Sequence, residues 1–401
     1  MMGNPKILFV GTACPFGDVS GAGLRTRNLI RLLQGFGEVT TVFATERDWS
    51  AEQEAQTRSA SKVALISRYL QTPVRSLKDR CRKVLDPAFL NTNGVEVPPQ
   101  DARLVEALVE SHDVVWLHTL KLANAFRRDR WPKSIMDVDD YPSRFHRSAA
   151  EHEPTLQRRL HRRQRSFSWR RHEAHCLDRF QLLTVCKPGD IAHFGDAERV
   201  RVVPNGFSVE GGDQFPYPPP VPRIGMIGDF NYLPNHNGLR WFMKEVWAEV
   251  RKDFPEVELR LAGKGSGEIA AEFPGQRVSG LGYVPDVAAE IGSWSLMIVP
   301  TRLGGGTHLK VAEGLARGVP IVTTEHGARG YDLVPGVQAL IAGNAGDFSQ
   351  ACRAILRDPG LGLRLREQGL ELFNRSYSWD SIGPSVGRTV EACIAMSKQR
   401  I

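Results

Sequence analysis

The sequence lacks the features that mark several classes of protein. No stretch approaches the roughly 18 consecutive apolar residues that a membrane-spanning helix needs. The six cysteines form no Cys-x-x-Cys pair, so we expect neither a disulfide framework nor a zinc site. Residues 1–5 hold no basic residue, and the apolar run Ile7–Val10 is too short for the core of a signal peptide. We therefore expect a protein of a reducing, cytoplasmic compartment.

What is present is the composition of an ordinary folded protein. The 401 residues are 41% hydrophobic and 24% charged, a balance typical of globular chains, and the length suits two domains. The formal net charge of +7 is unevenly spread, with basic residues gathered in Arg68–Lys83 and Leu156–Arg171. The second segment holds seven arginines, with Leu160, Phe167 and Trp169 between them. A solvated helix face and an anionic surface on the inner face of the cell membrane both explain residues 156–171, and we expect no nucleic-acid partner.

Short apolar runs alternate with amphipathic segments in the first half of the chain. A helix is predicted at Gly21–Leu33, and strands are predicted at Lys6–Val10, Val39–Phe43, Asp113–Leu117, Ile135–Val138, Leu182–Val185 and Val200–Val203. This rhythm predicts an α/β fold with a parallel sheet covered on both faces. Residues 50–100 are less regular, and we expect insertions there.

A change in residue composition separates the two halves of the chain. Residues 206–222 include five prolines, which neither a helix nor a central strand tolerates, so we place the linker there, after a first domain of residues 1–205. The βα rhythm then restarts, with helices at His236–Val250 and Leu309–Arg317 and strands at Ile224–Ile227, Val257–Ala262, Leu296–Val299 and Ile321–Thr324. Doubly wound units of this kind bind ligands at the carboxyl ends of their strands.

A glycine loop between a predicted strand and helix of the second half indicates an anion site. Gly304, Gly305 and Gly306 allow the backbone to approach a ligand closely. Their amides, with that of Thr307, then favour an anion at the start of the helix.

Two charged residues follow this loop. Lys310 lies near the helix start, where it can contact a phosphate as a point charge. Glu313 is three residues further on, shares the helix face of Lys310, and suits hydrogen bonding to ribose hydroxyls. An ordinary glycine turn with an exposed Lys–Glu pair is the alternative.

The segment resembles the donor-site signature of the family 4 glycosyltransferases, which are retaining enzymes with the GT-B fold. Glu313–Pro320 is similar to the second half of that signature, a Glu followed by small residues and Gly-x-Pro. The first Glu of the signature is absent, because Gly305 stands eight residues before Glu313. One branch of the family has a Gly-Gly-Gly-Thr-x-x-Lys loop at this place, and the sequence resembles that branch. There, loop amides can replace the missing carboxylate.

Other segments carry the same resemblance, most strongly over residues 200–380. Gly225–Gly228 resembles the glycine turn after the first strand of the donor domain, and Leu261–Gly265 resembles a strand-ending glycine pair. Gly282–Val284 resembles the loop that packs on the nucleotide base. The resemblance thus implies donor binding by Gly228, Lys264 and Tyr283.

The resemblance also indicates which residues contact the diphosphate and where the last helix begins. Many members hold the diphosphate with an Arg and a Lys, but Asp229 and Asn235 stand near those positions here. Lys310 is therefore the first candidate for the cation, followed by Arg240 and Lys264. Ser378-Trp379 resembles the start of a helix that returns to the first domain. We therefore expect a donor domain at residues 223–377 and a crossover helix at residues 378–401, packing on the N-terminal domain.

Two features of the first half fit the same family. Gly21 and Gly23 lie where the first strand leads into a helix, which also suits a dinucleotide-binding dehydrogenase. A third glycine and an acidic residue after the second strand are missing, so we expect no nicotinamide cofactor; the resemblance implies that this loop faces the donor. His118 ends a predicted strand; alone it is often structural, whereas the resemblance implies a role near the reacting sugar.

Asp139 and Asp140 follow another predicted strand. Paired aspartates at such a place can hold a divalent metal on a nucleotide sugar in the other major glycosyltransferase fold. The linker and the repeated βα pattern argue against that single-sheet fold. We expect both residues to line the acceptor side or to form a capped turn, and we expect no metal.

Together these observations predict an α/β protein of GT-B architecture, with two Rossmann-like domains facing across a cleft and a C-terminal helix crossing back to the first. The resemblance implies transfer of a hexose-type sugar from a nucleotide-sugar donor, a substrate rather than a cofactor, to a glycan or lipid-linked acceptor with retention of configuration. His118, Lys310 and Glu313 are the expected catalytic residues. A nucleotide-sugar epimerase on the same fold and a catalytically inactive membrane-surface scaffold remain as alternatives.

Overall fold

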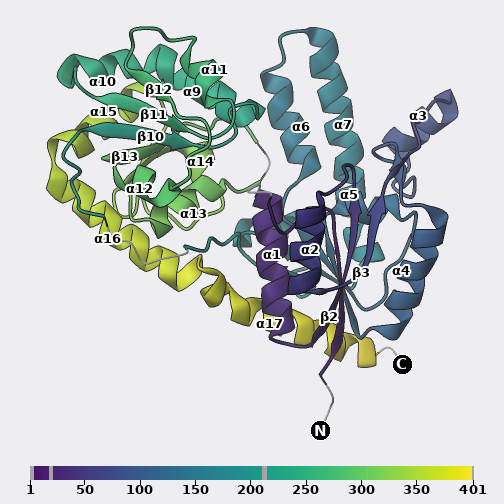
Figure 1. The fold of residues 1–401 in the computed structure, drawn as a ribbon. Helices are drawn as coiled ribbons and strands as arrows, with labels where there is room; N and C mark the ends of the chain where they lie inside the picture. The colour runs from purple at the N-terminus through teal and green to yellow at the C-terminus, as the bar shows by residue number, and fades with distance from the viewer. Residues whose placement is uncertain (1–3, 18–20, 210–214, 305, 400–401) are drawn as a thin grey trace. The chain divides into compact units, whose positions relative to one another are not determined.

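The computed structural model describes residues 4–17, 21–209, 215–304 and 306–399. The chain divides into two compact units, which Figure 1 shows in one ribbon. Unit 1 comprises residues 1–205 and 382–401, and unit 2 comprises residues 206–381. Each unit is built around its own parallel sheet.

The main sheet of unit 1 has seven parallel strands in the order β3-β2-β1-β6-β7-β8-β9. They are β1 (Lys6–Gly11), β2 (Glu38–Thr45), β3 (Lys62–Arg68), β6 (Val114–His118), β7 (Ser134–Val138), β8 (Leu182–Val185) and β9 (Val200–Val202). The central strands β1, β6, β7 and β8 are buried almost throughout, which explains the apolar runs Ile7–Val10 in β1 and Val114–Leu117 in β6. A small antiparallel ribbon joins β4 (Leu70–Gln71) to β5 (Val95–Glu96).

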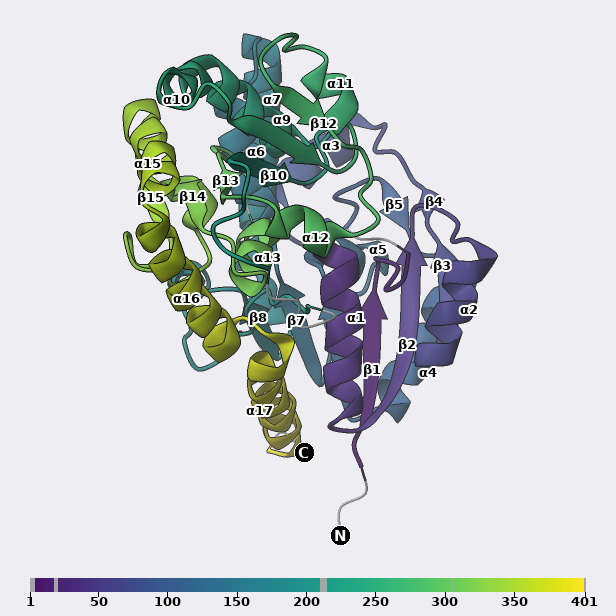
Figure 2. The same cartoon turned by 60° about the vertical axis from the view of Figure 1, so that its left-hand side comes forward.

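Helices pack on both faces of this sheet, and Figure 2 shows α1 beside β1. The helices of unit 1 are α1 (Gly21–Gln34), α2 (Ala51–Ala60), α3 (Leu77–Leu85), α4 (Pro99–Ser111), α5 (Leu120–Ala125), α6 (Pro142–Glu151), α7 (Leu156–Ala174), α8 (Cys176–Arg179), the 3₁₀ helix η1 (Pro188–His193) and most of α17 (Trp379–Lys398). The last helix is tied to the sheet, because the Gln181 side chain donates to the Cys393 carbonyl at 3.0 Å. Residues 382–399 therefore complete the core of the first half of the chain.

The region of residues 50–100 is more regular than the sequence indicates. The prediction of insertions is wrong for β3, which extends the main sheet through parallel pairing with β2. The strand was missed because it lies at the sheet edge, where its residues are only partly buried. The elements β4, α3 and β5 do lie outside the main sheet.

Unit 2 contains a six-stranded parallel sheet in the order β12-β11-β10-β13-β14-β15. Its strands are β10 (Arg223–Ile227), β11 (Glu258–Ala262), β12 (Val278–Gly280), β13 (Leu296–Val299), β14 (Ile321–Thr324) and β15 (Leu340–Ala342). Its helices are α9 (Leu233–Glu245), α10 (Trp247–Asp253), α11 (Ser266–Ala270), α12 (Val287–Gly292), α13 (Leu309–Ala316), α14 (Glu325–Ala328), α15 (Ala345–Arg357) and α16 (Pro359–Ser376).

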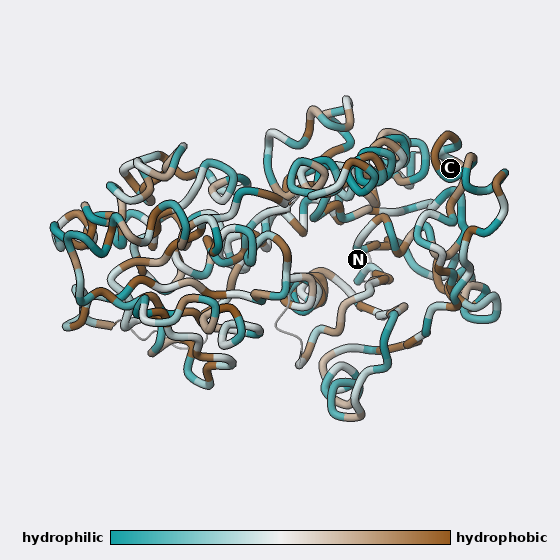
Figure 3. Tube along the Cα trace, turned by 90° about the horizontal axis from the view of Figure 1, so that it is seen from above, coloured by the Kyte–Doolittle hydropathy of each residue, from teal (hydrophilic) through white to brown (hydrophobic). Residues whose placement is uncertain are grey.

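Two hydrophobic cores lie on opposite faces of this second sheet. One gathers side chains of α9, α10 and α15, and the other gathers those of α12, α13 and α16. Along the helices of both units, Figure 3 shows hydrophilic and hydrophobic residues interspersed, as expected for amphipathic helices. The α/β, doubly wound fold predicted from the sequence is confirmed.

One predicted helix is in fact two. The sequence predicts a single helix over His236–Val250, but α9 ends at Glu245 and α10 begins at Trp247. Val246 lies between them with φ −120° and ψ −45°, and its side chain is fully buried. The apolar periodicity continues through the break, which is why the sequence pattern does not reveal it.

Strand order reverses between β1 and β6 in unit 1, and between β10 and β13 in unit 2. Loops that leave two such neighbouring strands diverge, and the crevice beyond their carboxyl ends is where doubly wound sheets bind ligands. His118 ends β6, while Gly228 follows β10 and the glycine loop follows β13. Among the described residues, no helix is long and apolar enough to cross a membrane.

Candidate functional site

In unit 2, the floor of the candidate site is made where β10 and β11 end. The Gly228 amide donates to the Ala262 carbonyl at 3.0 Å, and Gly263 lies against Gly228 with φ +121°. A Cβ on Gly263 would lie 2.2 Å from the Gly228 carbonyl oxygen, so only glycine fits there. The two strand ends can therefore meet closely beneath the site.

Lys310 extends from α13 to this glycine turn. Its ammonium group donates to Asn235 Oδ1 at 2.6 Å, and the Asn235 amide nitrogen donates to the Asp229 carbonyl at 2.8 Å. A Cβ on Gly228 would lie 3.3 Å from Lys310 Nζ, so the cation lies directly beside the turn. Asn235 thus holds the cation at the carboxyl end of β10.

Glu313 lies one turn further along α13 and is paired with Arg317. The Arg317 guanidinium donates to the Glu313 carboxylate at 3.2 Å, and both side chains are only about 15% exposed. Burial raises the pKa of Glu313, although Arg317 and Lys310 oppose that rise. The alternative of an exposed Lys–Glu pair is therefore wrong, because Glu313 is mostly buried and its hydrogen-bond partner is Arg317.

Burial lowers the pKa of Lys310 to about 8, with Glu313 opposing that shift. The cation is present below this pH and is lost as pH rises through it. We therefore expect the affinity for a nucleoside diphosphate to fall about tenfold between pH 7 and pH 9, since only the protonated amine attracts the anion. Isothermal titration at several pH values measures this, and Lys310→Arg should abolish the fall because arginine stays charged. An equal fall in Lys310→Arg would contradict the assignment.

The glycine loop leads from β13 to the start of α13. Gly304 and Gly306 are part-exposed, Thr307 packs against Gly330, and Gly305 lies outside the described residues. Gly304 has φ +137°, a conformation that favours glycine. The structure therefore puts the described part of the loop at the helix start that the sequence predicts.

Two histidines beside this loop were missed by the sequence analysis. The rings of His308 and His326 lie 5.7 Å apart, and a Cβ on Gly304 would lie within 4 Å of both. His308 precedes α13 directly, whereas His326 comes from α14, so only its position after β14 could have indicated its place here.

Lys264 and Tyr283 are both exposed residues of unit 2. Tyr283 is 78% exposed and follows Gly282, whose amide donates to the Ser266 hydroxyl. Lys264 follows Gly263 at the end of β11, and its carbonyl accepts from the Phe230 amide at 2.8 Å. Donor binding by these two residues stays a prediction.

In unit 1, Gly21 and Gly23 lie in the first turn of α1 rather than in a loop before it. Gly21 is exposed and Gly23 is buried. Both therefore lie where β1 leads into its helix, as the sequence predicts.

His118 ends β6 and is fully buried. Its Nδ1 lies 3.2 Å from the Thr26 hydroxyl of α1, and its Nε2 lies 3.3 Å from the Asp139 carboxylate. Burial alone would lower the pKa of His118, but the charges of Asp139 and Asp137 raise it overall. In return, His118 and Arg25 lower the pKa of Asp139 against the effect of its own burial. The structure thus pairs the imidazole of His118 with the carboxylate of Asp139, which directly follows the neighbouring strand β7.

Beneath this pair lies a buried ion pair that the sequence analysis missed. Arg25 of α1 donates to both carboxylate oxygens of Asp137, at 2.8 Å and 2.6 Å, and both side chains are almost fully buried. The guanidinium also donates to the carbonyls of Val203 and Pro204. The available signal was a charged residue on the apolar face of a helix, since α1 buries its neighbours Thr26 and Leu29 as well.

The side chains of Asp139 and Asp140 have different surroundings. Asp139 faces His118, whereas Asp140 is exposed and its carboxylate accepts from the Tyr141 amide at 2.7 Å, directly before α6. α6 has no side-chain cap at its start, so the capped turn stays a prediction. Within the described ranges, no group of three or more His, Cys, Asp or Glu side chains could hold a metal ion. That the reaction needs no metal, and that these residues line the acceptor side, remain predictions.

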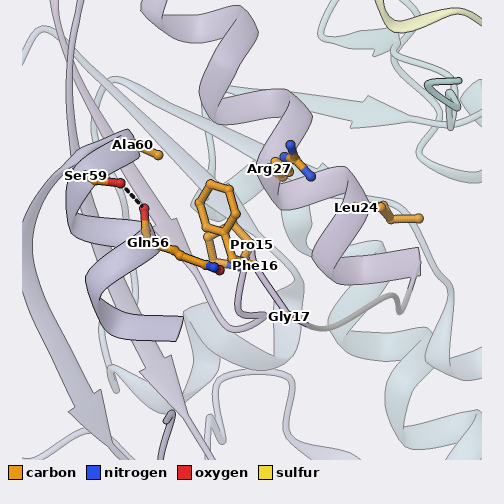
Figure 4. A pocket seen from close by; sticks show the side chains of 8 residues that line it. All are labelled: Pro15, Phe16, Gly17, Leu24, Arg27, Gln56, Ser59 and Ala60. Atoms are coloured by element: carbon orange, nitrogen blue, oxygen red, sulfur yellow. Dashed lines mark hydrogen bonds between the residues drawn. The ribbon is translucent and has the colours of Figure 1, made fainter. Parts of the chain in front are cut away.

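A shallow hollow of about 470 Å³ lies between α1 and α2 in unit 1 (Figure 4). Leu24 and Arg27 reach it from α1 and Gln56 and Ser59 from α2, while Phe16 lies beneath the Arg27 guanidinium at 5.2 Å. Neither Gly21 nor His118 lines it. The hollow therefore does not coincide with the predicted site.

Part of unit 2 matches a known protein family. Residues 221–358 match the family model described as glycosyl transferases group 1. This range contains Gly228, Asn235, Lys310 and Glu313. No match was found among curated proteins.

Several solved structures share this fold over nearly the whole length of the chain. Sucrose-phosphate synthase from Thermosynechococcus elongatus superposes with a TM-score of 0.69 at 15% identity, over 98% of this chain and 100% of that one. HepE from Anabaena, in complex with UDP and glucose, gives 0.63 at 15% identity over 96% and 99%. A variant of S. aureus TarM in complex with Fondaparinux, alpha-GlcNAc-glycerol and UDP gives 0.64 at 10% identity over 96% and 99%.

These similarities establish the fold of the chain. The chain has the GT-B fold of two Rossmann-like units. Within its second unit, residues 221–358 match the family model of group 1 glycosyl transferases.

Proposed function

We propose that this protein is a cytoplasmic, retaining glycosyltransferase of family 4, which transfers a hexose-type sugar from a nucleotide-sugar donor to a glycan or lipid-linked acceptor. One observation carries the proposal. A mostly buried lysine lies beside the glycine turn after β10, at the start of a helix that follows a glycine loop, inside the range of the family match. A cation and a helix start at a topological switch point suit a diphosphate.

In this mechanism unit 2 holds the donor. Lys310 and the amides around Gly304, Gly306 and Thr307 bind the diphosphate, and Glu313, oriented by Arg317, accepts from the ribose hydroxyls. As the bond between the sugar C1 and the diphosphate oxygen breaks, negative charge grows on the leaving group. A fixed ammonium stabilises that charge at little reorganisation cost, because Asn235 already holds it in place.

The acceptor hydroxyl then forms the new bond to C1 on the same face, and its proton passes to the departing diphosphate. The protein's part is to position both partners and to keep water away. We assign His118 to the sugar, with Asp139 and Thr26 fixing its ring, and Asp139 and Asp140 to the acceptor side. No metal ion is required. The UDP-glucose bound in the HepE structure favours a hexose donor.

Nucleotide binding tests the proposal first. We expect one of UDP, GDP, ADP or CMP, or its sugar conjugate, to raise the melting temperature, since a ligand of the native state stabilises it by mass action. The shift should disappear in Lys310→Ala and persist in Lys252→Ala, whose exposed side chain pairs with Glu249 in the same unit. No shift with any nucleotide would sink the proposal. Product analysis with the binding donor separates a transferase from an epimerase, which would convert the donor without an acceptor.

A further inference from the structure

The basic helix α7 exposes an apolar stripe. Leu156, Leu160 and Phe167 are 69%, 54% and 50% exposed. Their spacing of four and seven residues places them on one face of the helix, because 3.6 residues complete a turn. Arg163 falls on the same face, and Arg159 and Arg170 flank it.

The opposite face of α7 is buried, yet it holds polar residues that an ordinary amphipathic helix would expose. It buries the polar residues Ser168, His172 and Glu173 together with Trp169. Glu173 is the one acidic residue of the helix, and its carboxylate is hydrogen-bonded to Ser143 and His193. The exposed face therefore combines arginines with large apolar side chains, with no carboxylate of α7 to offset the charge.

Neighbouring α3 contacts the buried face of α7 and exposes a similar set of residues. The Ser168 hydroxyl of α7 donates to the Lys83 carbonyl of α3, so the two helices are joined. α3 exposes Leu77 and Leu85, at 77% and 60%, and carries Lys78 and Arg80 beside them. Two helices thus present the same mixture of basic and apolar groups.

The base of the surface is fixed to the candidate site of unit 1. α6 and α7 run side by side as a helical hairpin (Figure 1). α6 begins at Pro142, directly after Asp139, Asp140 and Tyr141. Glu173 binds the Ser143 amide at 2.9 Å and lies 3.0 Å from His193 of η1, so the hairpin is anchored where β7 and β8 end.

We propose that the exposed face of α7 docks on an anionic lipid bilayer, with Leu156, Leu160 and Phe167 entering the interfacial layer and the arginines contacting lipid phosphates. Basic residues attract an anionic surface, while apolar side chains on the same face gain only from a medium with an apolar interior. Nucleic acid would leave the leucines without such a medium. Docking does not depend on sugar transfer; that it brings a lipid-linked acceptor to the site rests on the proposed function.

The test is flotation of the purified full chain with vesicles, without any nucleotide. We expect binding to phosphatidylcholine vesicles that contain phosphatidylglycerol, weakened by salt, and little binding to phosphatidylcholine alone. Each basic residue near an anionic surface contributes about fivefold in partition, so Arg159→Glu/Arg163→Glu should lose at least about 25-fold. Leu156→Gln/Leu160→Gln should lose about tenfold, since the leucines no longer enter the interface.

The matched control is Lys244→Glu/Lys252→Glu, which changes the net charge equally on exposed positions of unit 2. It should bind as the original chain does, and all variants should keep their melting temperature. Equal binding to neutral vesicles, or full binding by either α7 variant, would overturn the proposal. So would binding of an RNA oligonucleotide that needs the arginines but not the leucines, in a protein that ignores vesicles. Since no donor is present, failure of the proposed transfer reaction would leave these outcomes unchanged.

Discussion

Replacing Lys310 by alanine is expected to lower turnover by about 10²-fold or more, equivalent to roughly 2.7 kcal/mol of transition-state stabilisation. The amine lies beside Gly228 and is held by Asn235, so it is fixed before any charge develops. Its contribution grows as the diphosphate departs, and the loss should therefore fall on kcat at least as strongly as on KM. Initial rates with the donor found by thermal shift measure both constants.

Stability should not account for this loss. Burial opposes the charge of Lys310, as its lowered pKa shows, so removing the amine relieves a desolvation cost that offsets the lost hydrogen bond to Asn235. Lys310→Met, which keeps the apolar stem, should melt at or above the temperature of the original chain and still lose turnover. Lys252→Ala is the control with unchanged rates. A Lys310→Ala protein that turns over normally would remove the lysine from the mechanism.

Replacing Arg25 by methionine is expected to destabilise unit 1 by about 3–5 kcal/mol, because it leaves the Asp137 carboxylate buried without its counter-charge. The guanidinium makes two bonds to Asp137 and satisfies the Val203 and Pro204 carbonyls, and almost none of it is exposed. The two units can unfold separately, so hydrogen exchange in β1, β6 and β7 is the appropriate measurement.

Two variants bracket this expectation. Arg25→Met/Asp137→Leu removes both charges and should recover much of the lost stability. The Thr184 hydroxyl then loses the Asp137 carboxylate to which it donates a hydrogen bond. Arg58→Met breaks an exposed pair with Glu54 at 4.0 Å and should cost less than about 1 kcal/mol. If Arg25→Met cost no more than Arg58→Met, the buried pair would not hold unit 1 together.

The central strands could be predicted from the sequence, and most edge strands could not. β1, β6 and β13 are buried on both faces and contain unbroken apolar runs of four residues. β3, β12 and β15 lie at sheet edges, are short or only partly buried, and carry no comparable run. Tertiary pairing rather than local sequence places such strands.

The candidate site divides in the same way. Lys310 and the loop before it were predictable, because the amides, the glycines and the cation follow one another along the chain. The contact of Lys310 with Asn235 spans 75 residues, and that of Arg25 with Asp137 spans 112 residues. The spacing of residues along the chain does not reveal such pairs, because they form only when the whole unit folds.

The position of the last helix determines the order in which the two units are completed during synthesis. In topological terms unit 2 is an insertion in unit 1, since the chain leaves unit 1 after Asn205 and re-enters it at Ile382. Unit 2 is one continuous stretch and can fold as soon as it emerges from the ribosome. The core of unit 1 still lacks Val386, Val390 and Cys393 at that moment, all three of which are buried in the finished protein. The half of the molecule that is synthesised first is therefore the half that is completed last.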